Sequence, residues 1–259
     1  MIKIIVTPKT IMAHNTDTGD SVLVPALKDS YKKIIQVLKS KKANAKEEAW
    51  EIAVNCNVKK SITTKTSRIT FEKNTAFIDG NKIENALSNK LIWMAENGYD
   101  PNPILKFYDN CKLNPNAESV KDLYTFIEMN KLPLTADGCI LAYKKVCSTG
   151  DGKTFTSSHD KKTKYIIGKD TKMKRDLCDH DRNSHCSTGL HVGAWDYVKS
   201  FSGDTMILMR INPKDWVSTP TDYNCQKARC CCIHTVCVYD ATTPIEQEYI
   251  KVSKFKKKK

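Results

Sequence analysis

The sequence predicts an α+β protein with a helical middle segment followed by a β-rich, barrel- or sandwich-like C-terminal domain. Two observations support this. Between residues 83 and 130, apolar residues recur every three or four positions, as on a helix with one buried face. After Asp137-Gly138, short runs of β-branched and aromatic residues alternate with turn residues, as in strands. We expect four parts: a small α/β region (1–82), the helical segment (83–130), the β-rich domain (131–240) and a basic tail (241–259).

The first part begins with three predicted strands, at residues 2–6, 10–13 and 21–24, separated by Pro8 and by the turn at Thr18-Gly19-Asp20. Pro25 then opens a helix, and a second helix is predicted at 45–54 from its Ala- and Glu-rich composition. Two further strands are expected at 68–71 and 75–78, followed by a turn at Asp79-Gly80.

Three packed helices are predicted in the second part. The first carries an apolar stripe from Ile83 to Ala95 and ends before Gly98. The second begins at Pro103 and places Leu105 and Tyr108 inward. The third is capped by Asn116 and ends at Leu132-Pro133, with an apolar stripe between.

The third part is predicted to contain mostly strands, with one short helix at 194–201. The expected strands cover residues 139–146, 154–156, 165–167, 189–192, 205–211, 215–218 and 229–239. The last of these is the longest, and we expect its cysteines to be buried as small apolar side chains.

Charge and composition restrict the class of protein. Lys and Arg number 42 against 29 Asp and Glu, a net charge of +13, but only five of the basic residues are arginine. The tail supplies six lysines: Lys251, Lys254, Lys256, Lys257, Lys258 and Lys259. Removing these six leaves 36 basic residues against 29 acidic ones, a net charge of +7. Lysine attracts polyanions without reading base sequence, so weak contact with nucleic acid or an anionic membrane is expected through this tail.

Several classes are disfavoured by absent patterns. No apolar run approaches the ~18 residues that cross a bilayer, and no phosphate-binding glycine motif occurs. With eleven cysteines and no export signal, the thiols are expected to stay reduced. We expect neither a metal nor another cofactor.

The densest polar stretch is the segment 178–191, called here the His/Cys loop, which holds three of the six histidines and two cysteines. Three interpretations remain open. It is a hydrogen-bonded structural loop, a zinc site, or a catalytic site in which Cys186 is the nucleophile and His191 or His185 the base, because a thiolate needs a nearby imidazole. No catalytic residue is firm. Further along, Asp222 or Asp215 either pairs with a basic group such as Arg229 or accepts hydrogen bonds from backbone amides as a turn aspartate.

Four sequence motifs occur in an order that is typical of one protein family. They are residues 117–128 with 132–144, then 185–193, then 211–223, and finally 227–230. Their order resembles the rapid-lysis B protein family of T-even-type bacteriophages, the rIIB-like family, over roughly residues 75–239. Five residues from these motifs are our candidates for partner binding: Tyr143, Lys144, Asp222, Tyr223 and Arg229.

The resemblance implies an early phage protein associated with lysis inhibition and with protection of the infected cell from prophage-encoded exclusion. We expect it to act by binding and not as an enzyme. It implies a partner, the companion A-type protein or a host protein, and a place in the host cytoplasm or peripherally at the membrane. Two alternatives stay open: a Cys/His-dependent enzyme centred on Cys186 and His191, and a nonspecific nucleic-acid-binding protein.

Overall fold

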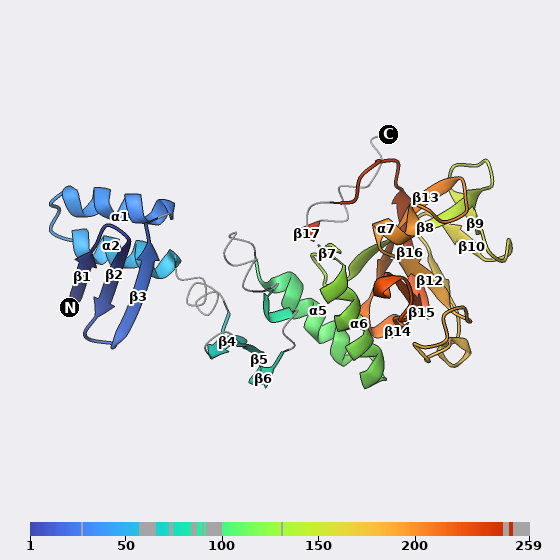
Figure 1. Ribbon diagram of the computed structural model, residues 1–259, viewed down its shortest axis with the longest axis horizontal. Coiled ribbons are helices and arrows are strands. Elements are labelled where there is room, and N and C mark those ends of the chain that lie inside the picture. The colour runs from blue at the N-terminus through green and yellow to red at the C-terminus, as the bar shows by residue number, and fades with distance from the viewer. Residues whose placement is uncertain are drawn as a thin grey trace. The chain divides into compact units, whose positions relative to one another are not determined.

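The computed structural model describes residues 1–26, 28–56, 66–72, 75–83, 87–89, 91, 100–130, 132–245 and 249–250 (Figure 1). The chain divides into two compact units, 1–101 and 102–259. The predicted α+β class is confirmed, with strands dominating the C-terminal half. Most of the helix expected after residue 83 and the lysine tail lie outside the described residues, and the four-part division remains a prediction.

The N-terminal sheet has the order β1 (Ile2–Val6), β2 (Thr10–Asn15), β3 (Asp20–Pro25), all antiparallel. Helices α1 (Asp29–Lys39) and α2 (Ala45–Cys56) cover one of its faces (Figure 1). Alternation along the strands supplies the core, because every second side chain points to the same face. The buried residues that meet between sheet and helices are Ile11, Ala13, Val22, Val24, Ile34, Ala49 and Ala53.

The opposite face of this sheet carries a row of exposed apolar residues. Ile5 pairs with Met12, and Met12 pairs with Leu23, so the three lie side by side across the strands. Their exposed fractions are 59%, 40% and 61%.

A second small sheet in this unit has the order β4 (Ile69–Glu72), β5 (Thr75–Ile78), β6 (Asn81–Lys82). Its turn is held by Arg68, which donates from Nε and Nη2 to the two carboxylate oxygens of Asp79, each at 2.8 Å. The predicted strands at 68–71 and 75–78 are therefore present to within one residue.

Helices α5 (Asn102–Lys112) and α6 (Ala117–Met129) open the second unit. The predicted cap is present: the Asn116 side chain accepts from the backbone N–H groups of Glu118 and Ser119. The expectation for α5 was partly wrong, because Phe107 is completely buried whereas Tyr108 is half-buried. Phe107 and Tyr108 are adjacent aromatic residues, and the sequence alone does not show which of the two faces the core.

A large, mostly antiparallel sheet follows the helices, and it is not closed into a barrel. Its main path runs β11 (Asp170–Lys172), β16 (Cys232–Val238), β13 (Thr205–Ile211), β8 (Ile140–Ser148), β12 (Leu190–Gly193), β15 (Lys227–Cys230), β14 (Trp216–Ser218). Four strands join it from the side: β7 (Leu134–Thr135), β9 (Thr154–Ser157), β10 (Lys164–Ile166) and β17 (Tyr249–Ile250).

Short helical turns connect these strands. They are α7 (Trp195–Val198), η1 (Arg175–Leu177), η2 (Pro213–Asp215) and η3 (Tyr223–Cys225). Within the described ranges, no helix combines the length and apolar character needed to cross a bilayer.

The long strand predicted at 229–239 is broken at Cys231. The two pieces pair with different neighbours: β15 lies between β12 and β14, whereas β16 lies between β13 and β11. At the break, the Cys231 N–H donates to the Asp215 carbonyl at 2.9 Å, outside both ladders. Only Cys230 of the three adjacent cysteines is fully buried; Cys231 and Cys232 are half-buried.

Candidate functional site

The His/Cys loop connects η1 to β12 and lies beside β15. Its ends are brought together by a hydrogen bond from the Asp179 N–H to the Thr188 carbonyl, 2.9 Å. Six of its side chains are exposed: His180, Asp181, Asn183, His185, Cys186 and Thr188. The loop therefore offers a polar surface on a closed backbone frame.

Arg229 anchors this loop from β15. Its side chain is completely buried, and Nη1 donates to the carbonyl of Asp181 at 2.9 Å and to Ser218 Oγ at 3.3 Å. Nη2 donates to the Ser184 carbonyl. A guanidinium that satisfies several loop carbonyls replaces the backbone pairing that the loop lacks. Its Nε has no hydrogen-bond partner among the described residues.

Gly189 lets β12 approach this arginine. A Cβ atom at that position would lie 3.0 Å from the Arg229 Cβ and 3.2 Å from its Cγ. The register sets this contact, because Leu190 pairs with Cys230 and His191 with Arg229.

A second buried cation, Lys227, lies two residues before Arg229 on the same strand. Its Nζ is 2.6 Å from Asp222 Oδ2 and also donates to the His185 carbonyl. Asp222 therefore pairs with a basic group, but the cation is Lys227 and not the suggested Arg229. The Arg229 guanidinium is instead occupied by the loop carbonyls of Asp181 and Ser184.

The three catalytic candidates, Cys186, His191 and His185, differ in environment. Cys186 is exposed, while His191 is half-buried on β12. Burial first, then the charges of Lys144 and Arg229, lower the pKa of the His191 imidazole to about 3. An imidazole with such a pKa is neutral at pH 7, so it does not provide the imidazolium that stabilises a thiolate. His185 is exposed, with Nε2 3.3 Å from Thr221 Oγ1.

Lys144 and Tyr143 lie on β8, which pairs with β12. The Lys144 ammonium donates to the His191 carbonyl at 2.7 Å and lies 5.1 Å from the centre of the Tyr165 ring. Burial lowers its pKa to about 8, against the opposing charge of Asp160. Tyr143 is 1% exposed, and its hydroxyl accepts from the Ile245 N–H at 2.8 Å.

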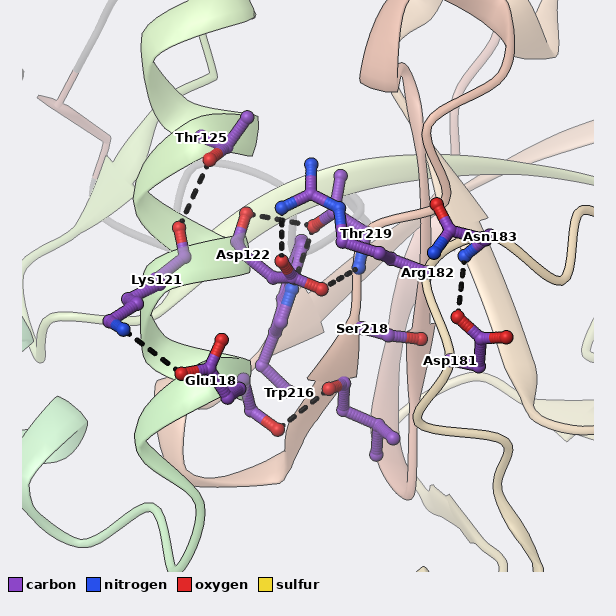
Figure 2. Close-up of polar contacts among 12 residues, drawn as sticks. Glu118, Lys121, Asp122, Thr125, Asp181, Arg182, Asn183, Trp216, Ser218 and Thr219 are labelled. Atoms are coloured by element: carbon purple, nitrogen blue, oxygen red, sulfur yellow. Dashed lines mark hydrogen bonds and ion pairs between the residues drawn. The ribbon is translucent and has the colours of Figure 1, made fainter.

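Asp122 of α6 ties the helices to the His/Cys loop (Figure 2). Its Oδ1 is 2.8 Å from Arg182 Nη1, and its Oδ2 accepts from the Thr219 N–H at 3.0 Å. Thr219 Oγ1 donates to the Asp122 carbonyl and accepts from Trp216 Nε1. Burial raises the pKa of Asp122, and the Thr219 N–H and Arg182 oppose that shift.

Arg175 makes a second connection from η1. Its Nη2 donates to Asn114 Oδ1 at 2.9 Å, to Ser119 Oγ at 3.0 Å and to the Trp216 carbonyl at 2.7 Å. Asp122, Arg175 and Arg182 were not among the predicted site residues. One signal was available: arginine is scarce in this chain, and three of its five arginines hold this one region.

The zinc interpretation finds no ligand set in the structure. Among the described residues, no three His, Cys, Asp or Glu side chains come together in a way that would hold a metal ion. Burial also raises the pKa of the Cys230 thiol well above its ordinary value, which disfavours the thiolate form that binds zinc.

Comparison with known proteins shows the family to which the chain belongs. The sequence profile of the family described as "Bacteriophage T4 protein rIIB" matches residues 4–244, which include α5, α6, the main path of the large sheet and the His/Cys loop. The chain therefore belongs to the bacteriophage T4 rIIB family. Protein rIIB of Enterobacteria phage T4 is 28% identical over 217 residues, covering 83% of this chain and 67% of that protein. No solved structure matches.

Proposed function

We propose that this rIIB-like phage protein acts by binding, as an accessory that modulates the timing of lysis or counters prophage-encoded exclusion. The observation that carries the proposal is the family match over residues 4–244. The proposed partner is the phage's companion A-type protein, with a host protein as the alternative. The proposed location is the host cytoplasm, with a peripheral position at the membrane as the alternative.

The His/Cys loop is the proposed contact surface. Loops that expose polar side chains on a rigid scaffold are where binding residues concentrate. This loop is fixed from two sides, by Arg229 on the sheet and by the Asp122–Arg182 pair on the helix. A surface held in this way loses little conformational entropy when a partner binds, which favours affinity.

The neutral imidazole of His191 supports a binding role over a Cys/His enzyme. A catalytic pair needs a base that gains a proton near neutral pH, whereas burial and four neighbouring basic groups disfavour protonation of His191. The fully buried Arg229 and Tyr143 are proposed to position the surface and not to touch the partner.

The test replaces exposed loop side chains and keeps the anchors. The double variant His185→Ala with Cys186→Ser changes two exposed residues; Lys227 and Arg229 bond to loop carbonyls, which remain. The matched control is His159→Ala with Cys147→Ser, an exposed His in the turn after β9 and a half-buried Cys on β8, both outside the His/Cys loop. Each full-length variant is supplied to a phage lacking the chain, and plating is measured on hosts with and without an exclusion prophage.

We expect the loop variant to lose plating on the prophage-bearing host and to lose co-purification with the companion A-type protein. The control should retain both. Loss of plating with co-purification intact would contradict a function through this contact, and full activity of the loop variant would remove the loop from the contact surface. Activity lost with Cys186→Ser alone, while the partner still binds, would favour the enzymatic alternative.

A further inference from the structure

A pocket of about 320 Å³ lies on the surface between α7 and η3. Its walls include three aromatic side chains: Tyr197, Phe201 and Tyr223. The Tyr197 ring is central, with its centre 5.7 Å from that of Phe201 and 5.2 Å from that of Tyr223. Phe201 is 42% exposed and Tyr223 65% exposed, so aromatic faces are available to a ligand.

The backbone that presents Tyr223 is strained. Tyr223, Asn224 and Cys225 have φ values of 47°, 54° and 53°, in the left-handed region that residues with a Cβ rarely adopt. Such a conformation is unfavourable and persists only when its surroundings hold it. Neighbouring elements hold this turn: Asn130 Nδ2 donates to the Cys225 carbonyl at 3.0 Å, and the Ala194 N–H donates to the Gln226 carbonyl at 2.8 Å.

The pocket wall formed by α7 is packed closely against the strand that precedes it. A Cβ at Gly193 would lie 2.8 Å from Tyr197 Cδ1 and 3.0 Å from the Gln226 carbonyl oxygen. The strand before α7 therefore packs directly against the central ring. The left-handed turn at Tyr223 and the close contact at Gly193 therefore fix the positions of Tyr223 and Tyr197.

The described lining of the pocket is less basic than the rest of the chain. In a protein of net charge +13, the lining contains no lysine or arginine and one carboxylate, Asp196. Asp196 is 66% exposed and pairs with the exposed Lys199, an ion pair of a kind that contributes little and exchanges readily. Lys227 lies 5.4 Å from the centre of the Tyr223 ring, but Asp222 neutralises it at 2.6 Å.

From this combination we infer that the pocket binds a cationic side chain of a partner polypeptide, namely the guanidinium of an arginine. A flat guanidinium stacks on tyrosine and phenylalanine faces and forms paired hydrogen bonds with a carboxylate such as Asp196. The side-chain amides of Asn224 and Gln226 at the rim supply further acceptors. This inference goes beyond the proposed function, because it holds whether or not the chain acts in lysis control.

The test is a titration of the ¹⁵N-labelled full-length chain with the peptide N-acetyl-Gly-Arg-Gly-amide. Its citrulline counterpart keeps the shape and removes the charge. We expect saturable NMR shifts at the side-chain amides of Asn224 and Gln226, with the citrulline peptide binding about fivefold more weakly, the ratio that ~1 kcal/mol of cation–π and ionic attraction gives.

Three variants sharpen the result. Asp196→Asn should reduce affinity for the arginine peptide toward that for the citrulline peptide. Tyr223→Ala should weaken both, and the matched control Asp176→Asn, which removes an exposed carboxylate outside the pocket, should change neither. Equal affinity for the two peptides, or no effect of Asp196→Asn, would overturn the inference. Tighter binding of adenosine or uridine monophosphate at the same amides would also overturn it, by making this a nucleobase pocket.

Discussion

The carboxylate of Asp122 lies 2.8 Å from the guanidinium of Arg182, and this ion pair joins α6 to the His/Cys loop across 60 positions of the chain. Asp122 is 5% exposed, whereas the Arg182 side chain is 38% exposed, so the pair lies at the boundary between core and solvent. The buried partner matters more for stability, because removing it also deprives the Thr219 N–H of its acceptor.

We predict that Asp122→Ala lowers the free energy of unfolding by about 2 kcal/mol, since it leaves a buried N–H unpaired and a guanidinium without its carboxylate. Urea unfolding followed by circular dichroism measures the change. Glu118→Ala on the same helix is the control: its pair with Lys121 is exposed on both sides, and its loss should cost less than about 0.5 kcal/mol. Equal effects of the two substitutions would contradict the assigned role of Asp122.

We predict that the stability of the folded chain depends on pH through the protonation of His191. Its pKa is about 3 in the folded chain against an ordinary 6.5, so between these values the unfolded state binds a proton that the folded state does not. Stability is therefore lost as pH falls through this window, by about 2 kcal/mol between pH 6 and pH 4. His191→Gln removes the titrating group and should flatten this part of the profile.

Urea unfolding at pH 4, 5, 6 and 7 compares the wild-type chain with this variant. The matched control is Thr188→Gln, an exposed change in the same segment that removes no titratable group and should keep the wild-type slope. A wild-type slope in His191→Gln would show that the imidazole titrates normally, and the argument against a base at this position would fail.

Local sequence signals predicted much of the fold. The strands at 2–6 and 205–211 match the structure, and the Asn116 cap is present, because each depends on residues close in sequence. The break at Cys231 was missed for the opposite reason. Residues on both sides of it have strand composition, and the break depends on pairing with separate strands and on a carbonyl from Asp215.

The candidate site shows the same limit. The His/Cys loop was visible as a dense polar stretch, and Asp222, Lys227 and Arg229 lie close together in sequence. Which of the two cations meets Asp222 depends on where the loop carbonyls lie, and no local pattern specifies that. Tyr197 and Tyr223, which line the pocket, are 26 positions apart in the sequence. The left-handed turn that brings them together contains no glycine, so no local residue pattern indicates it.

Two glycines with similar backbone conformation provide a test of close packing. Gly138 has φ +73° and Gly152 has φ +66°. A Cβ at Gly138 would lie 2.2 Å from the Phe107 backbone nitrogen, whereas one at Gly152 would meet nothing within 4 Å. Gly138→Ala should therefore cost more than about 3 kcal/mol, and Gly152→Ala only the ~1 kcal/mol of the left-handed backbone. Melting temperatures of the two variants measure the difference, and similar losses would contradict the predicted contact between α5 and the turn before β8.

The last prediction concerns the lysine tail, residues 251–259, which contains six lysines and no acidic residue. Deleting these nine residues should leave the melting temperature unchanged. It should weaken binding to duplex DNA of arbitrary sequence, because each lysine that neutralises a phosphate releases about 0.9 of a counterion. If all six make such contacts, the slope of log affinity against log salt becomes shallower by about 5.

Fluorescence anisotropy with labelled DNA over a range of salt concentrations measures that slope in the full-length and shortened chains. A variant with the six tail lysines replaced by glutamine separates charge from length and should behave like the deletion. Binding that survives both changes with an unaltered slope would place the polyanion contact elsewhere on the chain. Binding that survives high salt would show that it is not of this electrostatic kind.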